Sequence, residues 1–110
     1  MVADAIPLPT LVFDEIDTGV SGEVALQMGL ILQAVSSKHQ VISITHSPQI
    51  AAKASVHYFV RKKVEGNQTY TEVSPLSVDE RILEIAKMLS GNPPSEIAKE
   101  NARELLGASI

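Results

Sequence analysis

Two short hydrophobic runs flank a longer periodic one in the first half of the chain. Residues 10–14 and 40–45 are rich in Val, Ile, Leu and Phe, which predicts two short strands. The continuous apolar run of the first is typical of a strand buried on both faces. Residues 23–36 carry apolar side chains around nearly the whole helical circumference, which predicts a helix enclosed by other elements. Strand, helix and strand in this order predict a βαβ unit with parallel strands and a right-handed crossover.

The second half of the chain predicts a β-hairpin followed by two helices. Strand-like runs at residues 56–63 and 69–73 lie on either side of a Glu-Gly-Asn-Gln turn. A capping box at residues 77–80 opens a helix that ends near Leu89. The last helix begins at Ser95, and its apolar stripe consists of Ala98, Ala102, Leu105 and Leu106. A short helix is also predicted after Ser47 and Pro48.

Composition limits the chain to one domain at most, with a modest aliphatic core. Its 110 residues are 45% hydrophobic and 4% aromatic. The net charge of −4 gives no general electrostatic reason to bind nucleic acid or an anionic membrane. The absence of cysteine excludes disulfides and thiolate metal sites and is compatible with a reducing cytoplasm. The apolar-rich stretch at residues 24–35 is too short for a membrane span, and residues 1–9 lack the features of a signal peptide.

Three acidic residues directly follow the first predicted strand: Asp14, Glu15 and Asp17. The carboxyl edge of an open α/β sheet is where such folds bind ligands, and adjacent carboxylates call for a cation or a shared proton. Asp14 can hold Mg²⁺, most often through water, and Glu15 can orient or deprotonate water beside a γ-phosphate. The alternative is a solvated loop beginning at Asp14. The hydrophobic run before Asp14 and the acid at Asp17 favour the functional interpretation.

His46 follows the second predicted strand and should therefore lie at the same edge as Asp14. A neutral imidazole there can donate a hydrogen bond to a phosphate oxygen. A lone histidine is more often an ordinary, partly buried residue, but its coincidence with the acidic edge favours a functional role. Direct metal chelation by His46 and the three acids, as in a metallohydrolase, is less favoured because the chain offers no further clustered ligands. His39 and His57 are interpreted as structural or surface residues.

Two further motifs receive mainly structural interpretations. The Arg-Lys-Lys run at residues 61–63 is typical of a solvated strand edge, with contact to phosphate or DNA as the alternative. Leu-Ser-Gly at residues 89–91 is similar to part of an ATPase signature motif. No Gly-Gln or Gly-Glu follows it, so it is interpreted as a helix C-cap.

The motifs together resemble a known family. Residues 11–15 (LVFDE) resemble the Walker B motif of ABC-type ATPases, and residues 44–46 (ITH) resemble their switch-histidine strand. The combination of FDEIDTGVSG at residues 13–22 with THSPQIA at residues 45–51 is similar to the RecN family of DNA-repair ATPases. The resemblance continues through YFV, RILEIAKMLSG and NARELL in the second half and covers nearly the whole chain from Leu8.

The resemblance implies an α/β fold, namely part of a P-loop NTPase lobe of the ABC/SMC-type head, with a parallel βαβ core, a β-hairpin and carboxyl-terminal helices. It implies that Asp14 is the Mg²⁺ acid, that Glu15 is the base that positions the hydrolytic water, and that His46 senses the γ-phosphate. Residues 17–22 correspond to the D-loop, which makes Asp17 and Ser21 candidates for nucleotide contact. This loop has Val-Ser-Gly in place of the common ABC form.

For the full protein, the resemblance implies ATP and Mg²⁺ as cofactors and recombinational repair of DNA double-strand breaks as the role. The implied partners are the amino-terminal half of the same head, a second head in an ATP-sandwich homodimer, and DNA, with no membrane. The implied location is the bacterial cytoplasm, in association with the nucleoid. A piece of another SMC or ABC ATPase remains an alternative, as does a non-catalytic interaction module.

The phosphate-binding half of such a head is missing from these residues. The chain contains no G-x-x-x-x-G-K-[ST] loop, no complete signature motif and no coiled-coil heptads. We therefore expect residues 1–110 to be the carboxyl-terminal portion of a head, with no bound ATP or Mg²⁺ and no hydrolysis on its own. Apolar surface should be exposed where the rest of the head packs.

Overall fold

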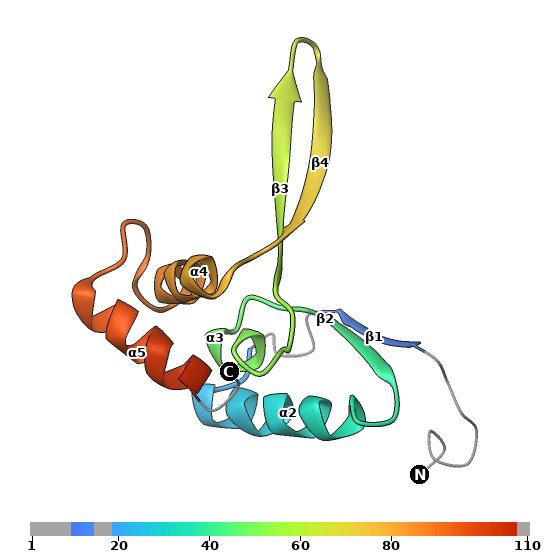
Figure 1. Ribbon diagram of the computed structural model, residues 1–110, viewed down its shortest axis with the longest axis vertical. Helices are drawn as coiled ribbons and strands as arrows, with labels where there is room; N and C mark the ends of the chain where they lie inside the picture. Colours follow the sequence, from blue (N-terminus) through green and yellow to red (C-terminus); the bar gives the residue numbers. More distant parts are fainter. Residues whose placement is uncertain (1–9, 15–18, 108–110) are drawn as a thin grey trace. The chain divides into compact units, whose positions relative to one another are not determined.

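The computed structural model describes residues 10–14 and 19–107 of the chain. In chain order its elements are β1 (Thr10–Asp14), α2 (Gly22–Val35), β2 (Gln40–Ile44), α3 (Pro48–Ala51), β3 (Tyr58–Glu65), β4 (Gln68–Pro75), α4 (Val78–Ser90) and α5 (Glu96–Gly107) (Figure 1). The chain divides between Ala54 and Ser55 into two compact units. None of the helices in the described ranges is long and apolar enough to cross a membrane.

The first unit contains a parallel strand pair joined by α2. β1 and β2 pair in a register that runs from Thr10 opposite Gln40 to Asp14 opposite Ile44. Ser21 begins α2 as its N-cap and has extended backbone angles, as N-cap residues do. The predicted strand–helix–strand unit and its parallel strands are thus confirmed.

α3 is a short helix that packs on α2. Ser47 is its N-cap and Pro48 occupies its first turn, as the Ser-Pro sequence predicts. The two helices approach closely at Gly29, where an added Cβ would lie 3.1 Å from Lys53 Cγ and 3.3 Å from the carbonyl oxygen of Gln49. A glycine at this position therefore lets the backbone of α3 lie directly against α2.

The core of the first unit covers one face of the strand pair. Its buried residues and the partly buried residues packed on them are Ala25, Leu32, Ile50, Phe13, Met28 and Val41. On the opposite face Val12 is 62% exposed and Ile42 is 46% exposed. The prediction that β1 is buried on both faces is therefore wrong for the described residues. The physical reason is that both helices of this unit contribute to the same core, so the second face of the sheet has no cover among them.

α2 is also less enclosed than its sequence predicts. Its buried positions form one stripe, made of Ala25, Gly29 and Leu32. Val24 and Ile31 lie outside this stripe and are exposed, so the prediction of a helix enclosed on all sides is wrong for the described part of the chain. The reason is again that α3 and the strand pair cover one side of the helix.

The second unit begins with the predicted hairpin, whose first strand is shifted by two residues and whose second strand is longer than expected. β3 and β4 pair antiparallel, with Glu65 opposite Gln68 at the tip. Gly66 takes a φ of +61° in the two-residue turn, a backbone conformation that such hairpin turns require. The two faces of the hairpin differ in character. One face carries exposed Val60 and Val73 opposite each other, and the other carries the Arg61–Glu72 pair.

The two carboxyl-terminal helices pack on each other. The predicted capping box is present in α4: the Ser77 hydroxyl accepts a hydrogen bond from Glu80 N, and the Glu80 carboxylate accepts one from Ser77 N. The hydrogen bond that Ser77 N donates to the Glu80 carboxylate lowers the pKa of Glu80. The side chains buried between the helices include Ile85, Ala86, Ala98, Ala102 and Leu106. The predicted apolar stripe of α5 is therefore confirmed, although the helix runs on to include Gly107.

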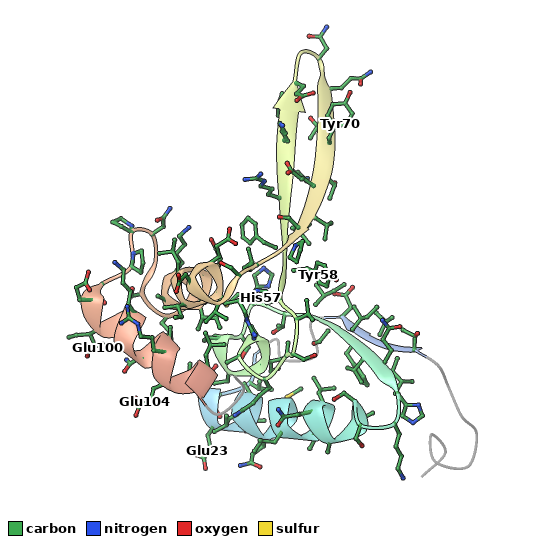
Figure 2. All side chains as sticks on the ribbon, viewed as in Figure 1. Glu23, His57, Tyr58, Tyr70, Glu100 and Glu104 are labelled. Atoms are coloured by element: carbon green, nitrogen blue, oxygen red, sulfur yellow. The ribbon has the colours of Figure 1, made fainter. Side chains whose placement is uncertain are left out.

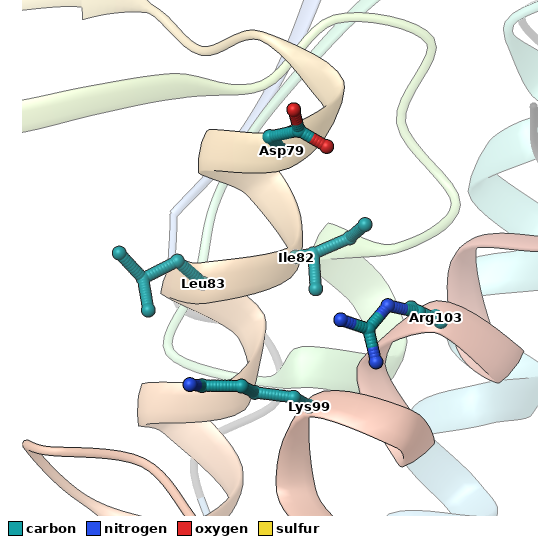
Figure 3. Close-up of a pocket in the computed structure, with 5 residues that line it drawn as sticks. All are labelled: Asp79, Ile82, Leu83, Lys99 and Arg103. Atoms are coloured by element: carbon teal, nitrogen blue, oxygen red, sulfur yellow. The ribbon is translucent and has the colours of Figure 1, made fainter. Parts of the chain in front are cut away.

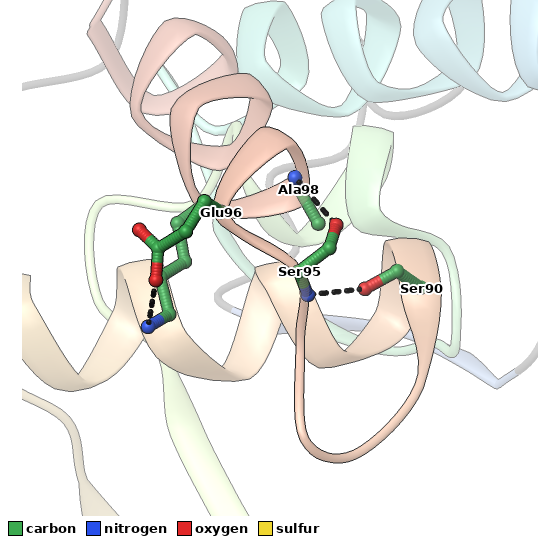
Figure 4. A network of polar contacts seen from close by, with 5 residues as sticks. Ser90, Ser95, Glu96 and Ala98 are labelled. Carbon is green, nitrogen blue, oxygen red and sulfur yellow. Dashed lines mark hydrogen bonds and ion pairs between the residues drawn. The ribbon is translucent and has the colours of Figure 1, made fainter.

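A serine pair joins α4 to α5. Ser90 Oγ accepts a hydrogen bond from Ser95 N at 3.1 Å, and Ser95 Oγ accepts one from Ala98 N at 3.1 Å (Figure 4). Gly91 ends α4 with a φ of +92°, which is unfavourable for residues with a side chain. The interpretation of Leu-Ser-Gly as a C-cap is thus confirmed.

Candidate functional site

The parallel register brings Asp14 and His46 to the same edge of the first unit. Asp14 is the last residue of β1 and pairs with Ile44, the last residue of β2. His46 follows two positions later, beyond Thr45. Asp14 and His46 are both exposed. The structure therefore agrees with the predicted placement of one carboxylate and one imidazole at the carboxyl end of a parallel strand pair, open to solvent.

Glu15 and Asp17 lie outside the described residues. Their predicted roles as the water-activating base and as a nucleotide contact remain predictions.

The turn that carries His46 is fixed by hydrogen bonds on its carboxyl-terminal side. Ser47 N donates to Thr45 Oγ1 at 2.9 Å. The Ser47 hydroxyl accepts from Ile50 N at 3.3 Å and donates to Gln49 Oε1 at 3.0 Å. Ser47 itself is buried. Because this buried hydroxyl uses both its donor and an acceptor position, the backbone next to His46 has little freedom to change conformation.

Ser21 has a structural task that the sequence analysis did not assign to it. Its hydroxyl accepts a hydrogen bond from Val24 N at 3.3 Å, and its carbonyl accepts one from Ala25 N at 2.9 Å. It thereby caps α2, and Glu23 adds a carboxylate in the first turn of that helix (Figure 2), where negative charge is favourable. The hydroxyl of Ser21 keeps its proton available to an acceptor, so the predicted nucleotide contact is compatible with the cap.

Among the described residues, few side chains at this edge could bind a metal ion. Within residues 10–14 and 19–107, no group of three or more His, Cys, Asp or Glu could hold a metal ion. Mg²⁺ retains several waters in proteins and needs only one or two carboxylates when phosphate oxygens supply further ligands. An exposed Asp14 at the edge of the sheet fits such a hydrated ion.

His57, for which the sequence predicts only a structural or surface position, has an unusual environment. Its carbonyl accepts a hydrogen bond from Leu76 N at 2.8 Å and so helps close the base of the hairpin. Its ring (Figure 2) has a buried Nδ1 with no hydrogen-bond partner among the described residues. Burial lowers the pKa of His57, the nearby positive charge of Arg81 lowers it further, and Glu84 partly opposes both. A histidine before a strand gives no sequence signal of this kind, because the cause is tertiary.

The basic run at residues 61–63 is largely neutralised within the hairpin. Arg61 pairs with Glu72 at 3.1 Å, and Lys63 pairs with Glu65 at 3.3 Å. The hydrogen bond from Arg61 lowers the pKa of Glu72, and the charge of Arg61 adds to that effect. Both pairs are solvated, which agrees with the interpretation of this run as a strand edge.

An open pocket of about 300 Å³ lies between α4 and α5, and its lining is chemically mixed (Figure 3). The lining residues are Asp79, Ile82, Leu83, Lys99 and Arg103. Lys99 Nζ is paired with Glu96 at 3.1 Å, so one of the two cations is already engaged by a carboxylate. The pocket therefore has no concentration of charge that would select an anion.

Comparison with known proteins extends the similarity beyond the motifs. No family model matches the chain. The DNA repair protein RecN of Deinococcus radiodurans is 49% identical over 98 residues, which is 89% of this chain, and RecN of Bacillus subtilis is 42% identical over 97 residues, or 88%. RecN of Haemophilus influenzae is 38% identical over 106 residues, or 96%. Along most of its length the chain is similar to RecN proteins. It spans 17% of the length of the first two RecN relatives and 19% of the third.

A solved structure supports the fold of this RecN-like chain. A chain from a study of ATP-driven dimerization and DNA-stimulated activation of SMC ATPases superposes with a TM-score of 0.63, covering 81% of this chain and 53% of that chain. The sequence identity is 18%, so the likeness concerns the fold alone. The predicted fold class, an α/β fold like that of an SMC ATPase, is confirmed.

Proposed function

We propose that this chain contributes part of the ATP-hydrolysis site of a RecN-type DNA repair ATPase. The observation that carries the proposal is the parallel register that sets Asp14 and His46 at one edge of the strand pair. Similarity to RecN proteins along most of the chain supports the same assignment and favours RecN over another SMC or ABC ATPase. The proposal adds roles for particular residues.

Each residue at this edge has a distinct task in the proposed reaction. Asp14 holds hydrated Mg²⁺, which when bound neutralises charge on the phosphates. Glu15 orients the attacking water and accepts its proton. His46 donates a hydrogen bond to an oxygen of the γ-phosphate. Asp17 and Ser21 contact nucleotide from the loop that precedes α2.

The rest of the head is the first partner of this chain. The phosphate-binding loop is not among these 110 residues, so the chain alone is inactive. The exposed sheet face, which includes Val12, Ile42 and Ile44, is the kind of apolar surface that another part of a protein covers. We assign the covering role to the polypeptide that makes up the remaining length of RecN.

In the complete protein, two heads enclose ATP between them, and the cycle of binding and hydrolysis serves repair of DNA double-strand breaks by recombination. This places the protein in the bacterial cytoplasm with the nucleoid. A non-catalytic interaction module is the competing function, and the absence of a phosphate-binding loop from these residues is the observation that favours it.

Calorimetric titration with Mg·ATP distinguishes the two functions. The chain is titrated alone and after assembly with the remaining part of the Deinococcus radiodurans RecN head, with complex formation verified by gel filtration. We expect binding by the complex and none by the chain alone. Asp14→Asn in the complex should weaken binding in the presence of Mg²⁺ and leave it unchanged in its absence. A verified complex that binds no ATP would contradict the proposal.

A further inference from the structure

Gln49 touches α2 at two places. Its carbonyl oxygen lies where an added Cβ on Gly29 would be only 3.3 Å away. Its side-chain nitrogen, Nε2, lies where an added Cβ on Gly22 would also be 3.3 Å away. Gly22 and Gly29 are separated by about two helical turns. Gln49 therefore extends along α2, from the packing contact with α3 back to the first residue of the helix.

The orientation of the Gln49 amide follows from its contact with Ser47. The Ser47 hydroxyl accepts a hydrogen bond from Ile50 N, so its single proton is free to be donated. It donates that proton to Gln49 Oε1 at 3.0 Å. With the oxygen held by Ser47, the NH₂ group of Gln49 faces the amino-terminal end of α2 at Gly22. One side chain thus joins the turn after His46 to the start of α2.

Both ends of this link belong to the proposed site. On one side, Ser47 is also bonded through its backbone N–H to Thr45 Oγ1, directly before His46. On the other side, Gly22 directly follows Ser21, the N-cap of α2. Gln49 is half-buried, so the residues around it restrict the conformations of its side chain.

We propose that Gln49 is a positioning residue that fixes His46 relative to the amino-terminal end of α2. The inference rests on the proposed ATPase function, and Gln49 acts through His46 without touching nucleotide. Loss of the amide link lets the His46 turn shift relative to α2. A small misplacement of a group that acts in the transition state lowers kcat more than it changes substrate binding.

The test uses a chimaera in which this chain replaces the matching segment of the Deinococcus radiodurans RecN. Gln49→Ala removes the whole link, whereas Gln49→Glu keeps an acceptor for Ser47 and replaces the NH₂ group near Gly22 with a carboxylate oxygen. Gln27→Ala, an exposed position on α2, is the matched control. We expect Gln49→Ala to lower kcat about tenfold, as loss of a supporting contact does, with KM within about twofold, and Gln49→Glu to lower kcat less, because it keeps the contact with Ser47. Gln27→Ala should leave kcat unchanged, and melting temperatures verify that each variant is folded.

The decisive comparison repeats Gln49→Ala in a His46→Ala background. If Gln49 acts through His46, the second substitution has no further effect on kcat. An equal loss of kcat in both backgrounds would overturn the inference, as would a Gln49→Ala variant that matches Gln27→Ala. Failure of the proposed function has a different signature: Glu15→Gln would then leave hydrolysis by the chimaera unchanged.

Discussion

At the residue scale, the second unit contains charges that the sequence pattern did not place in its interior. Arg81 stands in α4 four positions after the N-cap Ser77 and is 4% exposed. Burial lowers the pKa of its guanidinium, and its positive charge in turn lowers the pKa of His57. From the sequence alone, an arginine near the start of a helix is expected at the surface. The capping box shows where the helix begins but not which of its faces other elements cover.

The environment of His57 predicts a pH dependence of stability. The folded pKa is lowered from 6.5, so the unfolded chain takes up a proton at a higher pH than the folded chain does. The stability contribution is therefore complete above pH 6.5 and is lost as the pH falls through the folded pKa of His57. The urea midpoint of unfolding should therefore decrease as the pH is lowered from 7.5 to below the folded pKa of His57. In a His57→Gln variant this decrease should be smaller. His39→Gln is the matched control, and an unchanged slope in the His57 variant would refute the assignment.

At the element scale, the sequence predicted where helices begin and end but did not predict how much of their surface is buried. The Ser77 capping box and the Ser47-Pro48 start were readable because capping is a local interaction. The approximate course of β1 and β2 and their parallel pairing were also predictable, because a helix joins them. The exposure of Val12 and Ile31 was not predictable, since apolar periodicity does not reveal which faces of a strand or helix other elements cover.

The packing of α4 on α5 depends on a few fully buried side chains. Ile85 is fully buried. Ile85→Ala should lower the free energy of unfolding of the second unit by about 3 kcal/mol, the cost of removing a buried aliphatic side chain and leaving a cavity. Leu83→Ala, at a 39% exposed position of the same helix, should cost less than about 1 kcal/mol. Urea denaturation followed by circular dichroism measures both, and equal losses would contradict the assignment of Ile85 to the core.

At the scale of the whole molecule, the chain leaves much apolar surface in contact with solvent. Val12, Ile42 and Ile44 share the uncovered face of the strand pair, and Val60 and Val73 lie opposite each other on the hairpin. The overall α/β class was readable from the order of elements. The site was readable only in part, because Asp14 and His46 follow from strand order, whereas the Gln49 contact depends on how α3 packs on α2.

Exposed apolar surface of this extent should bind a hydrophobic dye and favour self-association. We expect the isolated chain to enhance the fluorescence of anilinonaphthalene sulfonate and to elute earlier in gel filtration as its concentration rises. Ile42→Thr should reduce both effects while keeping a β-branched residue in the strand. Ile97→Thr, at a 71% exposed position on α5, is the control for loss of a single apolar side chain. A dye signal unaffected by Ile42→Thr would show that the exposed face of the strand pair is not the surface that binds the dye.

The central claim is that the acidic edge after β1 performs ATP hydrolysis, and Glu15→Gln in the RecN chimaera tests it most directly. The substitution preserves size and hydrogen bonding but removes the proton acceptor. We predict that ATP binding is retained and that kcat falls by at least about 100-fold, the usual contribution of a general base. Hydrolysis at an unchanged rate by a Glu15→Gln chimaera that still binds ATP would contradict the account.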